Sequence, residues 1–148
     1  MRGRLLDIGG RKIGKRGIFS PPLDRVDLWE YLNTDRLTEP DYCCSAEEIP
    51  LPDFSVDTVI MTELLEYLPE PKKVLSEIYR VIKYESNVLI SVPLLNPIHG
   101  DYWLDRKRYT TVSLKEMIEK EGFRIIKLEP MGSVGAVLYD ILRAAVGY

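Results

Sequence analysis

Residues 56–92 read VDTVIMTELLEYLPEPKKVLSEIYRVIKYESNVLISV, and this stretch decides the fold. Its two ends, Val56–Met61 and Asn87–Val92, are apolar runs that predict strands buried on both faces of a sheet. Between them, Pro71 suits a first helical turn. Apolar residues then recur at helical spacing, namely Val74, Leu75, Ile78, Val81 and Ile82. A strand, a crossover helix and a second strand predict the centre of a parallel sheet.

Upstream of this centre the sequence predicts two further strands, at 4–8 and 28–32, and a short third run at 42–45. The connection over 11–27 contains residues that resist a continuous helix: Gly14, Gly17, Pro21 and Pro22. We therefore expect a loop there, with at most a short helical turn.

Downstream, Ser113 and Glu116 have the spacing of a capping box, and Gly122 can end the helix that they open. Residues 123–128 then predict a strand. The tail at 135–146 predicts an amphipathic helix, whose apolar side must cover the sheet or a partner subunit.

Length and composition fit one domain over residues 1–148, since 45% of the residues are hydrophobic and 29% are charged. The pattern as a whole predicts an α/β fold: an open, mostly parallel sheet with helices on both faces and a weak first crossover. No apolar run is long enough to cross a bilayer, and no signal-peptide pattern follows Met1, so we expect no membrane partner and a cytoplasmic location.

Cysteine and histidine usage argues against a metal site. Cys43 and Cys44 are adjacent, which favours free thiols in a reducing compartment, and His99 is the sole histidine. The net charge of -3 makes nucleic acid an improbable partner, although basic residues crowd the N-terminus: Arg2, Arg4, Arg11, Lys12, Lys15 and Arg16. Recognition of RNA or phosphate therefore stays open as an alternative.

In an open parallel sheet, ligands bind beyond the carboxyl ends of the strands. The candidate residues lie at the ends of the predicted strands or in the loops that follow them: Asp7, Gly9, Gly10, Asp35, Ser45, Ala46, Thr62 and Glu63. Glycine lets a backbone approach a ligand closely, and a carboxylate can accept hydrogen bonds from both hydroxyls of a ribose. These loops together predict a cleft.

The whole chain resembles the class I S-adenosylmethionine-dependent methyltransferases, in particular the type 11 methyltransferase-domain family. The similarity is carried by 45–60, by 63–71, by the helix 75–83 with its Glu77 and Arg80, and by Gly122-Phe123. The resemblance implies a Rossmann-like fold in reduced form, without the upstream helices of many relatives, and S-adenosylmethionine as cofactor.

The same resemblance implies roles for the predicted cleft. Asp7, Gly9 and Gly10 match the motif that cradles the methionine and ribose parts of the cofactor, and Asp35 matches the acid on the ribose hydroxyls. Ser45 and Ala46 fall on the adenine side, whereas Thr62 and Glu63 lie at the methionine end.

The insert at 94–110 is dense in polar and aromatic residues and follows a central strand, so we expect the substrate there. It is similar to a family subgroup with a His-Gly motif and a following D-x-x-R-Y-T-like run. We expect His99 to act as a base, or alternatively to pack as a structural residue. The predicted substrate residues are Tyr102, Asp105, Arg108 and Tyr109, although Asp105 and Arg108 could equally form a structural ion pair.

Two main functions follow. The first is methyl transfer to a small-molecule or glycan-like acceptor, by a homo-oligomer joined through the C-terminal helix. The second is a binding or structural subunit that has lost tight cofactor binding, because Arg11 replaces a motif glycine and Ser45 replaces the adenine-side acid. A nicotinamide enzyme is a weaker third, since Gly9 and Gly14 keep the outer G-x-G-x-x-G spacing but Arg11 fills its middle.

Overall fold

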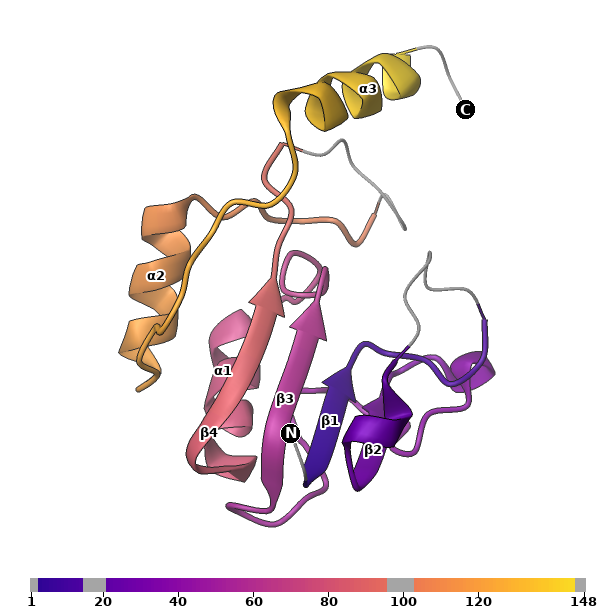
Figure 1. Cartoon of the computed structure of the whole chain (residues 1–148), viewed down its shortest axis with the longest axis vertical. Helices are drawn as coiled ribbons and strands as arrows, with labels where there is room; N and C mark the ends of the chain where they lie inside the picture. The colour runs from indigo at the N-terminus through magenta and orange to yellow at the C-terminus, as the bar shows by residue number, and fades with distance from the viewer. Residues whose placement is uncertain (1–2, 15–20, 96–102, 146–148) are drawn as a thin grey trace.

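The sheet of this chain has four parallel strands. The computed structural model describes residues 3–14, 21–95 and 103–145. The strands are β1 (Arg4–Ile8), β2 (Leu28–Leu32), β3 (Val56–Thr62) and β4 (Ile82–Ser91). They follow the order β2-β1-β3-β4, and every neighbouring pair is parallel (Figure 1). The predicted parallel α/β sheet is confirmed, and its four carboxyl ends meet at one edge.

The centre of the sheet is the most deeply buried part of the protein. Leu6 of β1 lies opposite Val59 of β3, and Ile8 lies opposite Met61; all four side chains are fully buried. Apolar residues on both central strands, β1 and β3, therefore form the core. The prediction of a strand buried on both faces is wrong for Asn87–Val92, because β4 is an edge strand of the described sheet and Leu89 is 57% exposed.

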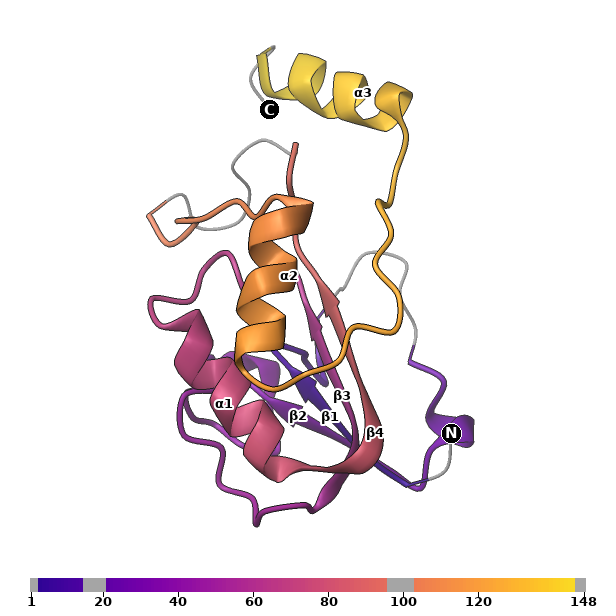
Figure 2. The same cartoon turned by 90° about the vertical axis from the view of Figure 1, so that its left-hand side faces the viewer.

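The sequence predicted helices on both faces of the sheet, but among the described residues the two α-helices beside it, α1 (Pro71–Val81) and α2 (Thr111–Lys120), lie on the same face (Figure 2). The predicted helical stripe is confirmed, because Val74, Leu75 and Ile78 are fully buried. The described part of the first crossover contains only the 3-10 helix η1 (Leu23–Arg25), which fits the expected short helical turn. A second 3-10 helix, η2 (Arg36–Thr38), follows β2.

Two local predictions are wrong. Helix α2 begins after Thr110, whose hydroxyl accepts a hydrogen bond from the Ser113 N–H at 3.2 Å. The N-cap residue is therefore Thr110, whereas the sequence predicted Ser113. The run at 42–45 forms no strand, and only one parallel bridge joins Tyr42 to Leu32. The error at the cap arises because Thr110 and Ser113 can both cap a helix, and in the structure it is the Thr110 hydroxyl that accepts the bond.

The predicted strand at 123–128 is also wrong. The chain that follows α2 crosses the outer edge of β4, from the side of the helices to the opposite side, before it rises to α3 (Figure 2), and the structure assigns residues 123–128 no pairing with β4. The sequence of these residues suits a strand, but a strand forms only with a hydrogen-bonding neighbour about 4.8 Å away.

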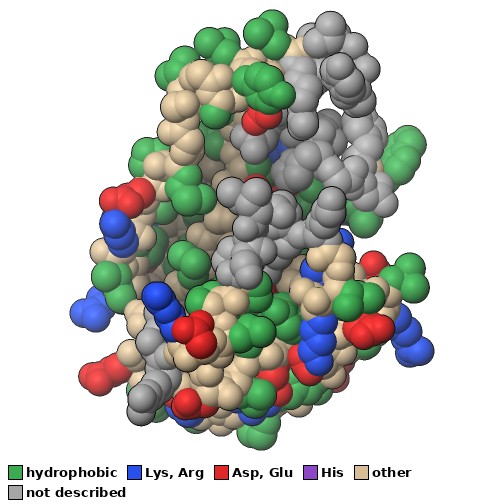
Figure 3. Space-filling model, turned by 45° about the vertical axis from the view of Figure 1, so that its right-hand side comes forward, with side chains coloured by type: hydrophobic (Ala, Val, Ile, Leu, Met, Phe, Trp, Pro, Cys, Tyr) green, Lys and Arg blue, Asp and Glu red, His purple; other side chains and the backbone are tan. Residues whose placement is uncertain are grey.

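The C-terminal helix α3 (Val134–Ala145) confirms the helix expected at 135–146 within the described residues. It stands apart from the sheet, and apolar side chains gather on the surface where it lies (Figures 2 and 3). The exposed ones include Val134, Leu138, Tyr139 and Leu142. Helix α3 therefore does not cover the sheet. No helix in the described part of the chain has the length and hydropathy needed to cross a membrane.

Candidate functional site

The loop after β1 forms the floor of the candidate site. Asp7 is fully buried, and Gly9 has a φ of +81°, which favours glycine. A Cβ atom at Gly10 would lie 2.4 Å from the Asp7 carboxyl carbon, closer than any real contact. The buried carboxyl group thus packs against a backbone that must lack a side chain. Asp7, Gly9 and Gly10 come together as predicted.

Asn33 fixes this loop, although no sequence motif pointed to it. Its side-chain amide donates to the carbonyls of Gly9 and Gly10 at 3.2 and 2.9 Å, while the Gly9 N–H donates to Leu32 O at 2.8 Å. Asn33 is the first residue after β2, so the turns after two neighbouring strands are joined. The sequence feature that could have indicated a role for Asn33 is its position directly after the predicted strand at 28–32.

Asp35 lies in the turn after β2, where the sequence placed it, but it has a local partner. Its Oδ1 accepts a hydrogen bond from the Leu37 N–H at 2.9 Å and thereby caps η2. The Asp35 N–H donates to Asn33 Oδ1 at 3.0 Å. The cap uses only one carboxylate oxygen, and Asp35 is exposed. Its other carboxylate oxygen can therefore still accept a hydrogen bond from a ligand hydroxyl.

Ser45 and Ala46 occupy a tight turn in different ways. The Ser45 hydroxyl accepts from the Glu47 N–H at 3.2 Å, while Ala46 is buried within the core cluster. The neighbouring Cys44 packs against the same core, and burial raises the pKa of its thiol. Of the two predicted adenine-side residues, Ala46 therefore supports the turn from inside, while Ser45 holds its backbone.

The carboxyl ends of β3 and β4 are joined through Glu63. This residue has a φ of +49°, and its N–H donates to Ser91 O at 3.0 Å. The Ser91 hydroxyl donates in turn to Glu63 Oε1 at 2.8 Å. Thr62, at the end of β3, precedes this junction. Glu63 thus brings a carboxylate to the strand edge.

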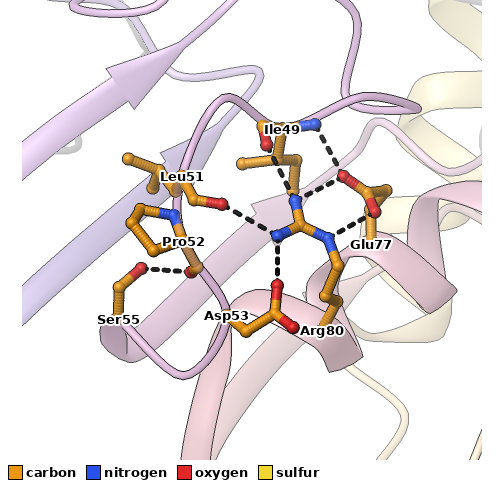
Figure 4. Close-up of polar contacts among 7 residues, drawn as sticks. All are labelled: Ile49, Leu51, Pro52, Asp53, Ser55, Glu77 and Arg80. Carbon is orange, nitrogen blue, oxygen red and sulfur yellow. Dashed lines mark hydrogen bonds and ion pairs between the residues drawn. The ribbon is translucent and has the colours of Figure 1, made fainter.

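Arg80 of α1 clamps the segment that follows Ser45 and Ala46 (Figure 4). Its guanidinium donates to the backbone oxygens of Ile49 and Leu51, each at 2.8 Å, and to Asp53 at 2.8 Å. Two further bonds, of 2.7 and 2.8 Å, join it to both carboxylate oxygens of Glu77.

Glu77 completes the clamp by accepting the Ile49 N–H at 2.8 Å. The hydrogen bonds from Arg80 hold the pKa of the Glu77 carboxyl below its ordinary value, and those same contacts raise the pKa of Arg80. The helix motif on which the family resemblance rests therefore has a clear role here: it attaches the turn at 49–53 to α1.

The described part of the predicted substrate insert packs on the loop after β3. The Arg106 N–H donates to Glu66 O at 3.1 Å, and the Tyr109 hydroxyl donates to Leu65 O at 3.3 Å. The Lys107 ammonium bonds the carbonyls of Leu68 and Pro69. These contacts place 103–110 beside the loop that carries Glu63.

Asp105 and Arg108 form a bidentate ion pair, with one contact of 2.8 Å between Nη2 and Oδ2. The Asp105 side chain is only 1% exposed, so the structural alternative for this pair is supported. Burial raises the pKa of both Tyr67 and Tyr109, and the nearby Glu66 carboxyl acts in the same direction. The tyrosines stay protonated at neutral pH and can donate hydrogen bonds.

His99 and Tyr102 lie outside the described residues. Among the basic N-terminal residues, Arg4 pairs with Glu30 and donates to the Tyr42 hydroxyl at 2.9 Å, while Lys12 pairs with Asp41. Both cations therefore serve the fold, which weakens the RNA alternative. Within the described ranges no group of three or more His, Cys, Asp or Glu side chains is arranged to hold a metal ion.

Comparison with known proteins extends this picture. Residues 22–90 match the family model described as a methyltransferase domain, which confirms the resemblance over that stretch. The chain is 31% identical over 94 residues to 2-methyl-6-phytyl-1,4-hydroquinone methyltransferase 1, a chloroplastic protein of Oryza sativa subsp. japonica. That alignment covers 59% of this chain and 27% of the rice protein, so the chain spans about a quarter of this relative's length.

Two solved structures show the same fold at low identity. Phosphoethanolamine N-methyltransferase 2 of Haemonchus contortus, solved in complex with S-adenosyl-L-methionine, is 19% identical with a TM-score of 0.67. The match covers 97% of this chain and 38% of that one. The [4+2]-cyclase SpnF is 22% identical with a TM-score of 0.63, over 84% of this chain and 52% of that one. A Rossmann-like fold is thus confirmed, and the fold alone does not fix the reaction.

Proposed function

We propose that this chain, whose residues 22–90 match the methyltransferase domain family, is an S-adenosylmethionine-dependent methyltransferase. The proposed acceptor is a small molecule or a glycan-like compound. One observation carries the proposal: the turn after β1 is a side-chain-free backbone over the buried Asp7, at the edge where the other strand ends converge.

The residues present fit an adenosyl cofactor. Gly9 and Gly10 leave room for close backbone approach, and Asn33 holds their carbonyls in place. The exposed Asp35 carboxylate suits a pair of ribose hydroxyls, and Glu63 supplies an anionic group at the opposite end of the edge. When bound, S-adenosylmethionine supplies an electrophilic methyl group on a sulfonium.

The contribution of the chain is to align the acceptor and to move a proton where the acceptor requires it. The segment at 103–110 lies beside the loop of Glu63, so we assign it to one wall of the acceptor site. Tyr109 belongs to this segment, and burial raises the pKa of its hydroxyl above an ordinary value that already keeps it protonated at neutral pH. The roles of His99 as a base and of Tyr102 as a substrate residue remain predictions.

A second function is a binding or structural subunit without methyl transfer. The observation in its favour is that Asp35 already caps η2 and that Arg11 is an exposed side chain next to the glycine turn. This alternative keeps the fold and predicts weak or no cofactor binding.

Calorimetry with S-adenosylmethionine and S-adenosylhomocysteine separates the two functions. We expect both ligands to bind the wild-type chain. The variant Asp35→Asn keeps an acceptor for the cap but removes the charge, so it should weaken binding about tenfold without lowering thermal stability. Asp24→Asn, in η1, is the matched control and should bind as wild type.

Two outcomes would decide against the first function. No heat at millimolar cofactor would remove S-adenosylmethionine as the ligand. Binding without methyl transfer to any of a broad panel of hydroxyl, amine and carbon acceptors would favour the subunit. The cytoplasmic location and a contact between copies through 135–146 also stay predictions.

A further inference from the structure

The loop after β1 is fastened to the loop after β2. Residues 9–14 form no helix, so their position depends on contacts with neighbouring loops. The N–H groups of Lys12 and Ile13 donate to Thr38 O at 3.1 and 3.4 Å. Thr38 is only 4% exposed, and its hydroxyl donates to Asp35 O at 2.7 Å. The far parts of the two loops are thus joined at one buried residue.

Asn33 joins the near parts of the same loops, directly after the strands. Its side-chain amide donates to the carbonyls of Gly9 and Gly10 at 3.2 and 2.9 Å. Its Oδ1 accepts a hydrogen bond from the Asp35 N–H at 3.0 Å. These contacts need two donor hydrogens and one acceptor oxygen, which an asparagine side chain supplies. A carboxylate has no hydrogen to donate and a hydroxyl has only one, so asparagine is the residue type that fits.

The partners of Asn33 on both loops belong to the proposed cofactor site. Gly9 and Gly10 form the turn that a ligand can approach closely, and Asp35 carries the exposed carboxylate. The direction of the Asp35 carboxylate depends on its backbone, and Asn33 holds the N–H of that backbone. A shift of the glycine turn is therefore passed to Asp35 through one side chain.

We propose that Asn33 is a positioning residue that makes the glycine turn and Asp35 bind the cofactor as one site. It acts through these groups and needs no contact of its own with the cofactor. This inference rests on the proposed function, because it takes the adenosyl cofactor as the ligand. Loss of the Asn33 amide should leave the contacts of Thr38 in place, so the loops would stay joined but would lose their alignment at the strand ends.

The variant Asn33→Asp tests the proposal with almost no change of shape. Calorimetry with S-adenosylhomocysteine at about pH 8 should show an affinity at least about tenfold lower than that of wild type, since a carboxylate then faces two carbonyl oxygens. At about pH 5 part of the carboxyl group is protonated and can donate again, so the loss relative to wild type should shrink about threefold or more. The matched control is Asn87→Asp, at an exposed residue of β4, which should bind as wild type at both pH values.

Hydrogen exchange on the chain without ligand provides a readout that does not depend on the cofactor. In Asn33→Ala the amide of Asp35 should exchange at least about tenfold faster, because its acceptor is removed. The amide of Gly9 should also exchange faster, because the turn loosens. The amide of Lys12 should keep its rate, since Thr38 O still accepts its hydrogen bond.

The outcomes separate this inference from the proposed function. If wild type binds S-adenosylhomocysteine and Asn33→Asp binds it equally well, the positioning role is wrong and the proposed function stands. A loss of affinity that does not recover at about pH 5 and comes with a lower thermal midpoint would assign Asn33 to the fold alone, which also overturns the inference. If wild type shows no heat while the exchange of Asn33→Ala rises as expected, the proposed function fails, and Asn33 joins two loops without a role for the cofactor.

Discussion

The body built from β1, β3 and α1 differs sharply from the strip that runs from the outer edge of β4 through 123–128 to α3. Leu75 in the body is 0% exposed, whereas Leu142 in the strip is 65% exposed. Both regions are rich in aliphatic residues. The difference teaches that apolar sequence forms a core only where the chain also provides an opposing surface.

The body is also the region where polar groups are coupled over long sequence distances. Arg80 reaches back 31 residues to the carbonyl of Ile49, and Asn33 reaches back 24 residues to that of Gly9. These contacts hold the candidate site. Among the described residues 124–145 of the strip, the hydrogen bonds and ion pairs join only residues that are close in sequence, such as Lys127 and Glu129.

The largest expected effect comes from truncating one leucine in each region. Leu75→Ala should lower the free energy of unfolding by about 2 to 5 kcal/mol, because it leaves a cavity under α1. Leu142→Ala should lower it by less than about 0.5 kcal/mol in the monomer. Urea denaturation at low protein concentration measures both. If both variants lost the same free energy of unfolding, the two regions would be equally well packed, and the contrast between body and strip would be wrong.

A second substitution tests the glycine turn of the body. Gly10→Ala forces a Cβ atom to within 2.4 to 2.7 Å of the Asp7 carboxyl group, so we expect a loss of about 1 to 3 kcal/mol and of cofactor binding. Gly135→Ala in α3 meets no atom closer than 3.8 Å and should leave stability equal or slightly higher. Differential scanning calorimetry with and without S-adenosylmethionine compares them. A fully stable Gly10→Ala protein would contradict the close contact.

The smallest expected effect is a pH dependence of stability, which arises from the hydrogen bonds between Arg80 and Glu77. Because Arg80 lowers the pKa of Glu77 in the folded state, the contribution of Glu77 is present above its ordinary pKa of 4.5 and is lost as the pH falls through the folded value. Glu77→Gln should therefore lower the free energy of unfolding by about 1 kcal/mol at pH 7. The difference in free energy of unfolding between this variant and wild type should become smaller below about pH 4.5.

Glu119→Gln is the control for that measurement, since Glu119 has only a loose contact with Lys115 at 3.9 Å. Its unfolding curve should follow wild type across the same range of pH. If the difference in free energy of unfolding between Glu77→Gln and wild type did not change with pH, Glu77 would act by packing and not by charge.

Much of the site could be predicted because its residues follow strands directly. Asp7, Gly9 and Gly10 stand at the end of a buried strand, and the family resemblance assigns them to the cofactor from sequence alone. The structure adds what spacing cannot give. Asn33 ties the glycine carbonyls together, and Arg80 anchors the turn at 49–53, because both contacts join residues that are distant in the chain.

The choice between a ligand and a local partner for polar side chains was not predictable from the sequence. Asp35 caps η2, and Asp105 pairs with Arg108, since a capping amide or a guanidinium happens to lie within reach. Sequence spacing allowed both a ligand role and a structural role for each of these residues. Only the folded positions of their neighbours separate the two.

The amino-acid sequence by itself determined the strand and helix periods, and thereby a parallel sheet with Gly9 and Gly10 at its ligand edge. Those features depend on residues adjacent in the chain. Tertiary structure alone decided that 123–128 stays unpaired and that α3 lies off the sheet, because a strand or an apolar helix face is stabilised only by a neighbour at the right distance.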